Sequence, residues 1–166
     1  MRVFLEKHGA AQHLWIFGAG HVAKELAALA GHVGFRVHVV DERPEWASAG
    51  RFPSVTSLEL KNPADVAKAL PGGPHAYFCV TTHDHPLDQA CVEQLLRKPG
   101  AYVGVIGSRR KAERFKLRLR AAGYSDAELE RMKSPMGVAI GALSPAEIAV
   151  SIVAELIAVR RGAGNA

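Results

Sequence analysis

The sequence FGAGHVA, at residues 17–23, places the strongest constraint on how this chain can fold. It follows the apolar run 14–17, which is typical of a buried strand, and it opens an amphipathic stretch that reaches about residue 32. Gly18 and Gly20 allow a tight turn and a close approach of the backbone to a phosphate, and Ala23 lets the helix pack on the strand. The segment predicts the strand–turn–helix unit that begins a dinucleotide-binding domain.

Short apolar runs alternate with helical patterns along the rest of the chain, which indicates parallel strands joined by helices. The predicted strands are 14–17, 36–40, a short one within 51–60, 76–81, 102–106 and 138–140. The predicted helices are 20–32, 62–70, 86–97, one that runs from the GSRRK segment to about 122, and two that begin at the capping boxes 125–128 and 144–147. We predict a single α/β domain, a Rossmann-like, doubly wound and mostly parallel sheet flanked by helices. Residues 1–13 form an N-terminal extension in this prediction, 14–162 the domain and 163–166 a tail.

Composition narrows the class of protein. Of the 166 residues 48% are hydrophobic and 22% are charged, which fits a globular domain and excludes a disordered chain. The net charge of +5 favours anionic ligands, but no aromatic residues are interleaved with the basic ones, so nucleic acid is not predicted. Cys79 and Cys91 show no CxxC spacing, and we see neither a secretory leader nor a membrane-spanning run. A cytoplasmic protein with no membrane partner is expected.

The glycine turn predicts a ligand site. Its backbone and side chains supply five candidate binding residues, namely Gly18, Ala19, Gly20, His21 and Val22. Asp41 ends the second predicted strand about 20 residues further on, where a carboxylate accepts hydrogen bonds from a ribose diol and favours NAD over NADP. Arg43 weakens that preference. A Rossmann scaffold whose turn binds nothing is the alternative.

Two further loops are predicted at the same edge of the sheet. The loop TTHDHPLD supplies Thr82, His83 and His85 as candidate ligand contacts, and its imidazoles and carboxylates could in principle bind a metal. Because H-x-H has no third dedicated ligand, no metal site is predicted.

The second loop, GSRRK, contributes four candidate cofactor contacts, which are Gly107, Ser108, Arg109 and Arg110. It places cations at the N-terminus of a predicted helix, where the helix dipole disfavours them. A bound anion would offset this repulsion, so the loop predicts a phosphate or pyrophosphate ligand.

Five segments in order resemble the Rossmann domain of the xanthine dehydrogenase accessory protein (XdhC/CoxI) family. They are IFGAGHVA, GFRVHVVDER, VTTHDHPLD, YVGVIGSRRKAERF and PMGVAIGALSPAEIAVSIVAELIAVR, and the resemblance runs from about Val3 to Arg161. It implies a cytoplasmic chaperone that binds molybdenum cofactor, as molybdopterin or its dinucleotide form. Such a chaperone assists sulfuration of the cofactor with a cysteine desulfurase and delivers it to a xanthine dehydrogenase-type molybdenum hydroxylase. In that family GAGHVA carries the histidine that stands here at His21.

Members of the family usually carry an additional N-terminal domain with a cysteine motif, and RVFLE at the start of this chain resembles the junction before the Rossmann domain. The chain is thus expected to be a piece of a longer protein or a single-domain homologue. The leading hypothesis is a cofactor insertion factor that is not itself an enzyme. The alternatives are an NAD-dependent oxidoreductase, with His83 or His85 as acid/base, and a domain that senses NAD or AMP. A homodimer through the apolar C-terminal helix stays open, since that helix could equally cover the sheet.

Overall fold

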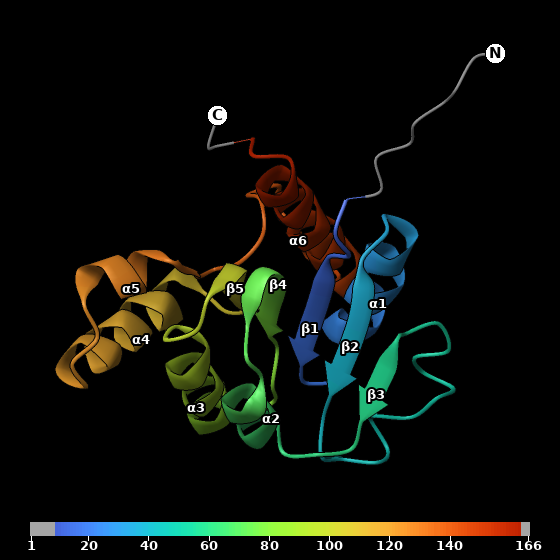
Figure 1. The fold of residues 1–166 in the computed structure, drawn as a ribbon, viewed down its shortest axis with the longest axis horizontal. Helices are drawn as coiled ribbons and strands as arrows, with labels where there is room; N and C mark the ends of the chain where they lie inside the picture. Colours follow the sequence, from blue (N-terminus) through green and yellow to red (C-terminus); the bar gives the residue numbers. More distant parts are fainter. Residues whose placement is uncertain (1–8, 164–166) are drawn as a thin grey trace.

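The computed structural model describes residues 9–163, which form a six-stranded sheet with helices on both faces (Figure 1). The strands are β1 (His13–Phe17), β2 (Arg36–Val40), β3 (Ser57–Glu59), β4 (Gly73–Val80), β5 (Gly100–Val105) and β6 (Met132–Lys133). The helices are α1 (His21–His32), α2 (Pro63–Ala69), α3 (His85–Leu95), α4 (Arg109–Ala121), α5 (Asp126–Glu130) and α6 (Pro145–Arg160). The predictions for residues 1–8 and 164–166 lie outside the described part of the chain.

The strand order is β3-β2-β1-β4-β5-β6, and every pair is parallel. The chain builds one half of the sheet outward from β1, then returns to β4 on the other side of β1 and builds the second half. This is the doubly wound Rossmann topology that the glycine turn predicted. A crevice forms where the order reverses, at the carboxyl ends of β1 and β4, and ligands of such sheets bind there.

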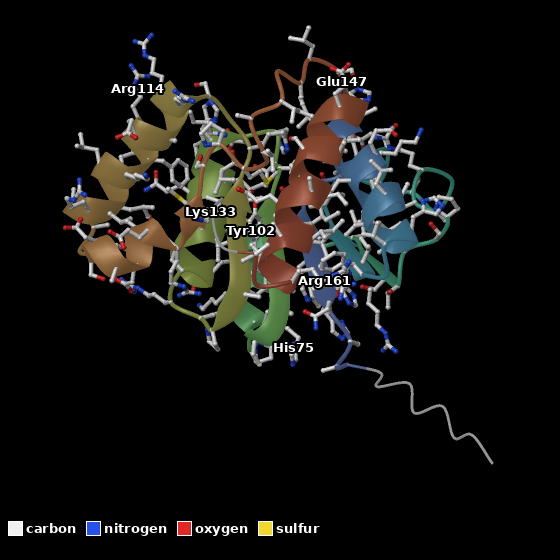
Figure 2. All side chains as sticks on the ribbon, turned by 90° about the horizontal axis from the view of Figure 1, so that it is seen from above. His75, Tyr102, Arg114, Lys133, Glu147 and Arg161 are labelled. Atoms are coloured by element: carbon white, nitrogen blue, oxygen red, sulfur yellow. The ribbon has the colours of Figure 1, made fainter. Side chains whose placement is uncertain are left out.

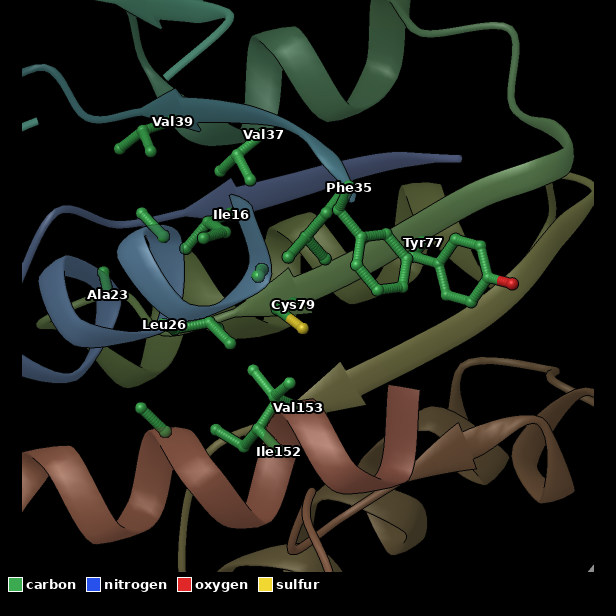
Figure 3. Packing of buried hydrophobic residues seen from close by; sticks show 14 of the residues in the cluster. Ile16, Ala23, Leu26, Phe35, Val37, Val39, Tyr77, Cys79, Ile152 and Val153 are labelled. Carbon is green, nitrogen blue, oxygen red and sulfur yellow. The ribbon is translucent and has the colours of Figure 1, made fainter. Parts of the chain in front are cut away.

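The two faces of the sheet are covered by different helices. Helices α1 and α6 pack on one face, where Ile16, Leu26 and Ile152 meet in a fully buried cluster (Figure 3). Helices α2, α3 and α4 cover the other, where Phe78 and Leu95 are also fully buried. Burial on both faces explains why the central strands are continuous apolar runs rather than alternating ones.

The predicted helix starts are confirmed, and their caps are visible. Asn62, Asp84 and Ser108 each accept a hydrogen bond from a backbone N–H in the first turn of α2, α3 and α4. Ser125 and Ser144 form complete capping boxes at α5 and α6, as their S-x-x-E sequences predicted. A side chain thus caps five of the six helices.

The predicted strand at 138–140 is wrong. The sixth strand is Met132–Lys133, and the later segment leaves the sheet to run along α6, where the Val138 N–H donates to the Ser151 carbonyl at 3.1 Å. Val138 and Ile140 are 46% and 54% exposed, so this short apolar run is not a buried strand. Within residues 9–163 no helix is long and apolar enough to cross a membrane.

Replacing Gly18 with alanine is expected to lower the free energy of unfolding by about 2–4 kcal/mol. The residue has φ +107°, and a Cβ there would lie 2.5 Å from the Thr81 carbonyl oxygen. Gly31→Ala is the matched control, because a Cβ at that exposed position in α1 meets nothing within 4 Å. It should stabilise the chain by about 0.5–1 kcal/mol. Urea unfolding measures both, and equal effects at the two sites would contradict this account of the turn.

Candidate functional site

The β1–α1 turn is fixed by its own backbone and by the ends of the neighbouring strands. The Gly18 N–H donates to the Val40 carbonyl at 2.7 Å, and the Ala19 N–H donates to Asp41 Oδ2 at 2.8 Å. Helix α1 then begins at Gly20, which has no side chain to cap it, and no acidic residue stands in the first turn. The positive end of the α1 dipole and its first N–H groups are therefore suited to an external anion.

A cavity of about 400 Å³ lies at this helix end, and we call it the switch-point cavity because it opens where the strand order reverses. Its walls come from the glycine turn, the loop after β2, the loop after β4, the end of β5 and the start of α6. Its lining residues are Gly20, His21, Val22, Ala23, Arg43, Trp46, Thr81, Thr82, His83, Ile106 and Pro145. The fold thus brings five of the predicted site residues, Gly20, His21, Val22, Thr82 and His83, to one cavity.

Asp41 is only 2% exposed and is not among the residues that line this cavity. Its two oxygens accept four hydrogen bonds, from the Ala19 N–H, the Arg43 N–H, and Nε and Nη2 of Arg43, at 2.7–3.0 Å. Burial alone would raise the pKa of Asp41, but the hydrogen bonds and charge of Arg43 and the Ala19 N–H outweigh it, so the pKa is lowered. The carboxylate that was predicted to meet a ribose instead ties the glycine turn to the end of β2.

Trp46 is a site residue that the sequence analysis missed. Two guanidinium groups lie over its ring, with Arg43 Cζ at 5.1 Å and Arg51 Cζ at 4.9 Å from its centroid, and the His21 ring meets it edge-on at 5.2 Å. Arg51 is itself fixed, because its Nη2 donates to the Ala19 carbonyl at 3.1 Å. An aromatic ring with cations on it, at the edge of an anion site, suits a ligand that combines a phosphate with a planar ring.

The GSRRK segment begins α4, as predicted, but one of its three cations already has a partner within the protein. Lys111 is not directed to a ligand, because its Nζ donates to the buried Asp88 carboxylate at 2.7 Å and to the Ile106 carbonyl at 2.9 Å. Asp88 Oδ1 also accepts from the Thr82 hydroxyl at 2.6 Å, so this pair joins the loops after β4 and β5. Arg109 and Arg110 are exposed and have no carboxylate within 4.0 Å among the described residues.

A second hollow, the α4 groove, has a volume of about 340 Å³ and is strongly basic. Its lining residues are His85, Ser108, Arg110, Lys111, Arg114, Phe115 and Arg118. His83 lines the switch-point cavity and His85 the α4 groove, so the loop after β4 separates the two. Gly107 and Arg109 line neither hollow, and Gly18, Ala19 and Asp41 are buried and line neither hollow as well.

Metal and thiol chemistry find little support in the residues described. No group of three or more histidine, cysteine, aspartate or glutamate side chains within 9–163 is arranged to hold a metal ion. Cys79 and Cys91 are both fully buried, and burial raises the pKa of both thiols, that of Cys91 to about 12. Neither is a reactive nucleophile in this fold.

Comparison with known proteins identifies the family. The model of the XdhC Rossmann domain matches residues 14–156. The chain belongs to this family. It is 34% identical over 164 residues to the Escherichia coli K12 protein named YqeB, covering 98% of this chain and 30% of that one. It is 32% identical over 159 residues to a Bacillus subtilis protein named as a probable subunit of xanthine dehydrogenase, covering 96% of this chain and 46% of that one.

A solved structure agrees with the fold. A crystal structure described as a xanthine dehydrogenase from Bacillus halodurans superposes with a TM-score of 0.81 at 34% identity, covering 92% of this chain and 43% of the other. This XdhC-family domain therefore spans less than half the length of each of these relatives.

The lowered pKa of Asp41 makes a pH-dependent contribution to stability. A depressed folded-state pKa stabilises the fold fully above the unfolded value of about 3.9, and the contribution is lost as the pH falls from there through the folded-state pKa. Asp41→Asn should therefore destabilise the chain at pH 7, and the gap to the unmodified protein should narrow towards pH 3. Urea unfolding between pH 7 and pH 3 measures it. A gap that does not change with pH would show that the ionised carboxylate contributes nothing.

Proposed function

We propose that this domain binds the phosphate-bearing part of molybdenum cofactor, as molybdopterin or its dinucleotide form. It would act as an accessory factor for a xanthine dehydrogenase-type molybdenum hydroxylase. The observation that carries the proposal is the uncapped N-terminus of α1 at the switch-point cavity. A Cβ built on Gly20 meets nothing within 4 Å, and the residue has an ordinary φ of −69°. The fold does not need glycine there, whereas a phosphate that approaches the backbone does.

The contrast with Gly18 supports this interpretation. Gly18 is required by the packing of the turn on β4, since its positive φ and its close approach to Thr81 exclude a side chain. The two glycines of the motif thus have separate roles, one in the fold and one in the approach of a ligand. A Rossmann scaffold that kept its turn but binds nothing would explain the glycine at Gly18 but not the glycine at Gly20.

The residues around the cavity fit the two chemical parts of such a cofactor. The N–H groups at the start of α1 suit the phosphate or pyrophosphate, and Arg43 adds a guanidinium to the lining. The Trp46 ring and the His21 imidazole offer apolar and polar surface for a planar ring system. When bound, the cofactor would supply the molybdenum centre that the hydroxylase uses, and this chain's part would be to hold and shield it.

The exposed guanidiniums of Arg109 and Arg110 lie at the start of α4, on the other side of the loop after β4. They would hold a second phosphate or extend the site towards a longer dinucleotide. Delivery to the hydroxylase and exchange with a cysteine desulfurase are parts of the same proposal, drawn from the family to which the chain belongs.

An NAD-dependent oxidoreductase is less well supported by the geometry. The ribose contact of such enzymes requires a free carboxylate at the end of β2, and here both Asp41 oxygens are occupied by Ala19 and Arg43. His83 lines the cavity and would be the acid/base in that case. The occupied carboxylate of Asp41 argues equally against a domain that senses NAD or AMP, since that domain would also need it free to bind a ribose.

Gly20→Val should weaken cofactor binding at least about tenfold without unfolding the protein. The added side chain occupies the space of the phosphate, and losing one charge-assisted contact costs at least about 1.5 kcal/mol, or roughly tenfold in affinity. Native mass spectrometry of protein made in cells that synthesise molybdenum cofactor measures retention. Gly31→Val is the matched control, on the same helix but away from the cavity.

A second readout works without the cofactor. The chain has two tryptophans, so Trp15→Phe leaves Trp46, at the cavity wall, as the single tryptophan, and its emission can be excited selectively. Titration with inorganic pyrophosphate should change its emission, and the change should be absent in Trp15→Phe/Gly20→Val. Equal cofactor retention by Gly20→Val and its control, or recovery of NAD alone, would overturn the proposal. The double variant Arg109→Ala/Arg110→Ala tests the α4 side and should also retain less cofactor.

A further inference from the structure

Three polar side chains from three neighbouring strands contact one another in a row across the sheet. His13 lies on β1, His38 on β2 and Ser57 on β3, and they share a face with Phe17 and Val40 because side chains alternate between the faces of a strand. His13 Nδ1 is 2.9 Å from His38 Nε2, and His38 Nδ1 is 2.7 Å from the Ser57 Oγ. Both ring nitrogens of His38 therefore have their partners inside the protein.

The sheet holds the His38 ring in place on both sides. Its register partners are Trp15 on β1 and Ser57 on β3. The Trp15 ring stacks on it, with the ring centroids 4.2 Å apart and the planes 14° from parallel, and His38 is only 8% exposed. A stacked indole attracts a single positive charge, so one added proton does not by itself disrupt this cluster.

The contact between the two histidines depends on their protonation. It needs one nitrogen that donates and one that accepts. When both rings are neutral, or when either ring carries one added proton, one of the two facing nitrogens can hold a hydrogen while the other keeps its lone pair. When both rings are protonated, His13 Nδ1 and His38 Nε2 both hold a hydrogen, and two positive charges face each other. Three of the four protonation states of the pair keep the contact, and the fourth excludes it.

We propose that the His13–His38 contact is a pH-sensitive latch at the amino edge of the sheet, which is closed until both imidazoles are protonated and then opens. His13 is the ring that moves, because it is the more exposed of the two and because Trp15 and Ser57 hold His38. The contact with Ser57 survives, since a protonated His38 still donates from Nδ1 to the hydroxyl oxygen. The inference is independent of which ligand occupies the switch-point cavity.

A cavity of about 410 Å³ lies beside this latch, and we call it the amino-edge cavity. Its lining residues are Ala11, His13, Trp15, Leu70, Pro71, Gly72, Gly73, Pro74, His75, Ala76 and Phe78, none of which lines the switch-point cavity. Figure 2 shows His75 on the far side of the molecule from Glu147, which lies in the first turn of α6. When His13 leaves His38, one wall of the amino-edge cavity moves and water gains access to the Trp15 ring.

The surroundings of His38 set the pH range in which the latch opens. Burial is the largest cause that lowers the pKa of His38, and His13 and Arg36 lower it further by their charge. Glu59 on β3 raises it, but the Glu59 carboxylate is already paired with Lys61 Nζ at 2.9 Å. The pKa therefore lies below the ordinary value of 6.5. A lowered folded-state pKa favours the neutral ring, so its stabilisation is complete above about pH 6.5 and is lost as the pH falls through the folded-state pKa.

His13→Gln separates the latch from the hydrogen bond. A glutamine amide both donates and accepts, so it can satisfy the facing nitrogen of His38 whether that ring is neutral or protonated. Between pH 7 and pH 4.5 the melting temperature should fall further for the unmodified chain than for His13→Gln. The difference should be about 3–5 °C for each unit by which the His38 pKa rises in the variant. His32→Gln is the matched control, because His32 is exposed at the end of α1, and it should behave as the unmodified chain does.

Two further measurements on the full chain locate the effect at the latch. In imidazole NMR spectra His38 should titrate below pH 6.5 in the unmodified chain and at a higher pH in His13→Gln. Trp46→Phe leaves Trp15 as the single tryptophan. Its emission should shift to longer wavelength as the pH falls from 7 to 4.5, and the shift should be absent in Trp46→Phe/His13→Gln. A His38 pKa that is the same with and without His13→Gln, or a Trp15 emission that does not respond to pH in this range, would overturn the proposal.

Discussion

The close approach of Gly18 to the end of β4 is the contact on which the carboxyl edge of this sheet depends. The Thr81 N–H donates to the Phe17 carbonyl at 2.8 Å, and an ideal Cβ on Gly18 would lie within 3 Å of the Thr81–Thr82 peptide. The strands β1 and β4 can therefore sit side by side while their following loops diverge to opposite faces. The switch-point cavity is the space between those loops.

Two buried carboxylates then hold the loops around that cavity. Asp41 connects the glycine turn with the segment after β2, and Asp88 connects the loop after β4 with Lys111 at the start of α4. Each is nearly inaccessible to solvent, and each accepts hydrogen bonds from both backbone and a cationic side chain. Removing one partner of such a pair leaves an uncompensated buried charge. These contacts hold the loops in place, and a site that is organised in advance would bind a ligand at a lower entropy cost.

Local patterns were sufficient to predict the elements, because their signals are local. Caps such as Ser125 and Ser144, and the spacing of Gly18 and Gly20, depend on neighbours within a few residues, and the apolar runs of the central strands follow from burial on both faces. The prediction of a strand at 138–140 was wrong for a related reason. Three consecutive apolar residues look the same whether they are buried in a sheet or, like Ile140, exposed on a loop, and only tertiary contacts distinguish the two.

The site was harder to predict than the fold, since it is made of contacts between distant segments. Nothing in the sequence near Trp46 indicates that Arg43 and Arg51 will lie over its ring, or that the His21 ring will meet it edge-on. Lys111 and Asp41 do lie at the carboxyl edge, as the sequence predicted. Each has its partner of opposite charge within the protein, because Lys111 pairs with Asp88 and Asp41 with Arg43. A charged residue beside a predicted site therefore indicates a ligand only when no buried partner of opposite charge is within reach. Arg109 and Arg110 meet that condition within residues 9–163, whereas Lys111 does not, and this difference leaves the two arginines and the uncapped end of α1 as the groups best suited to bind an anion.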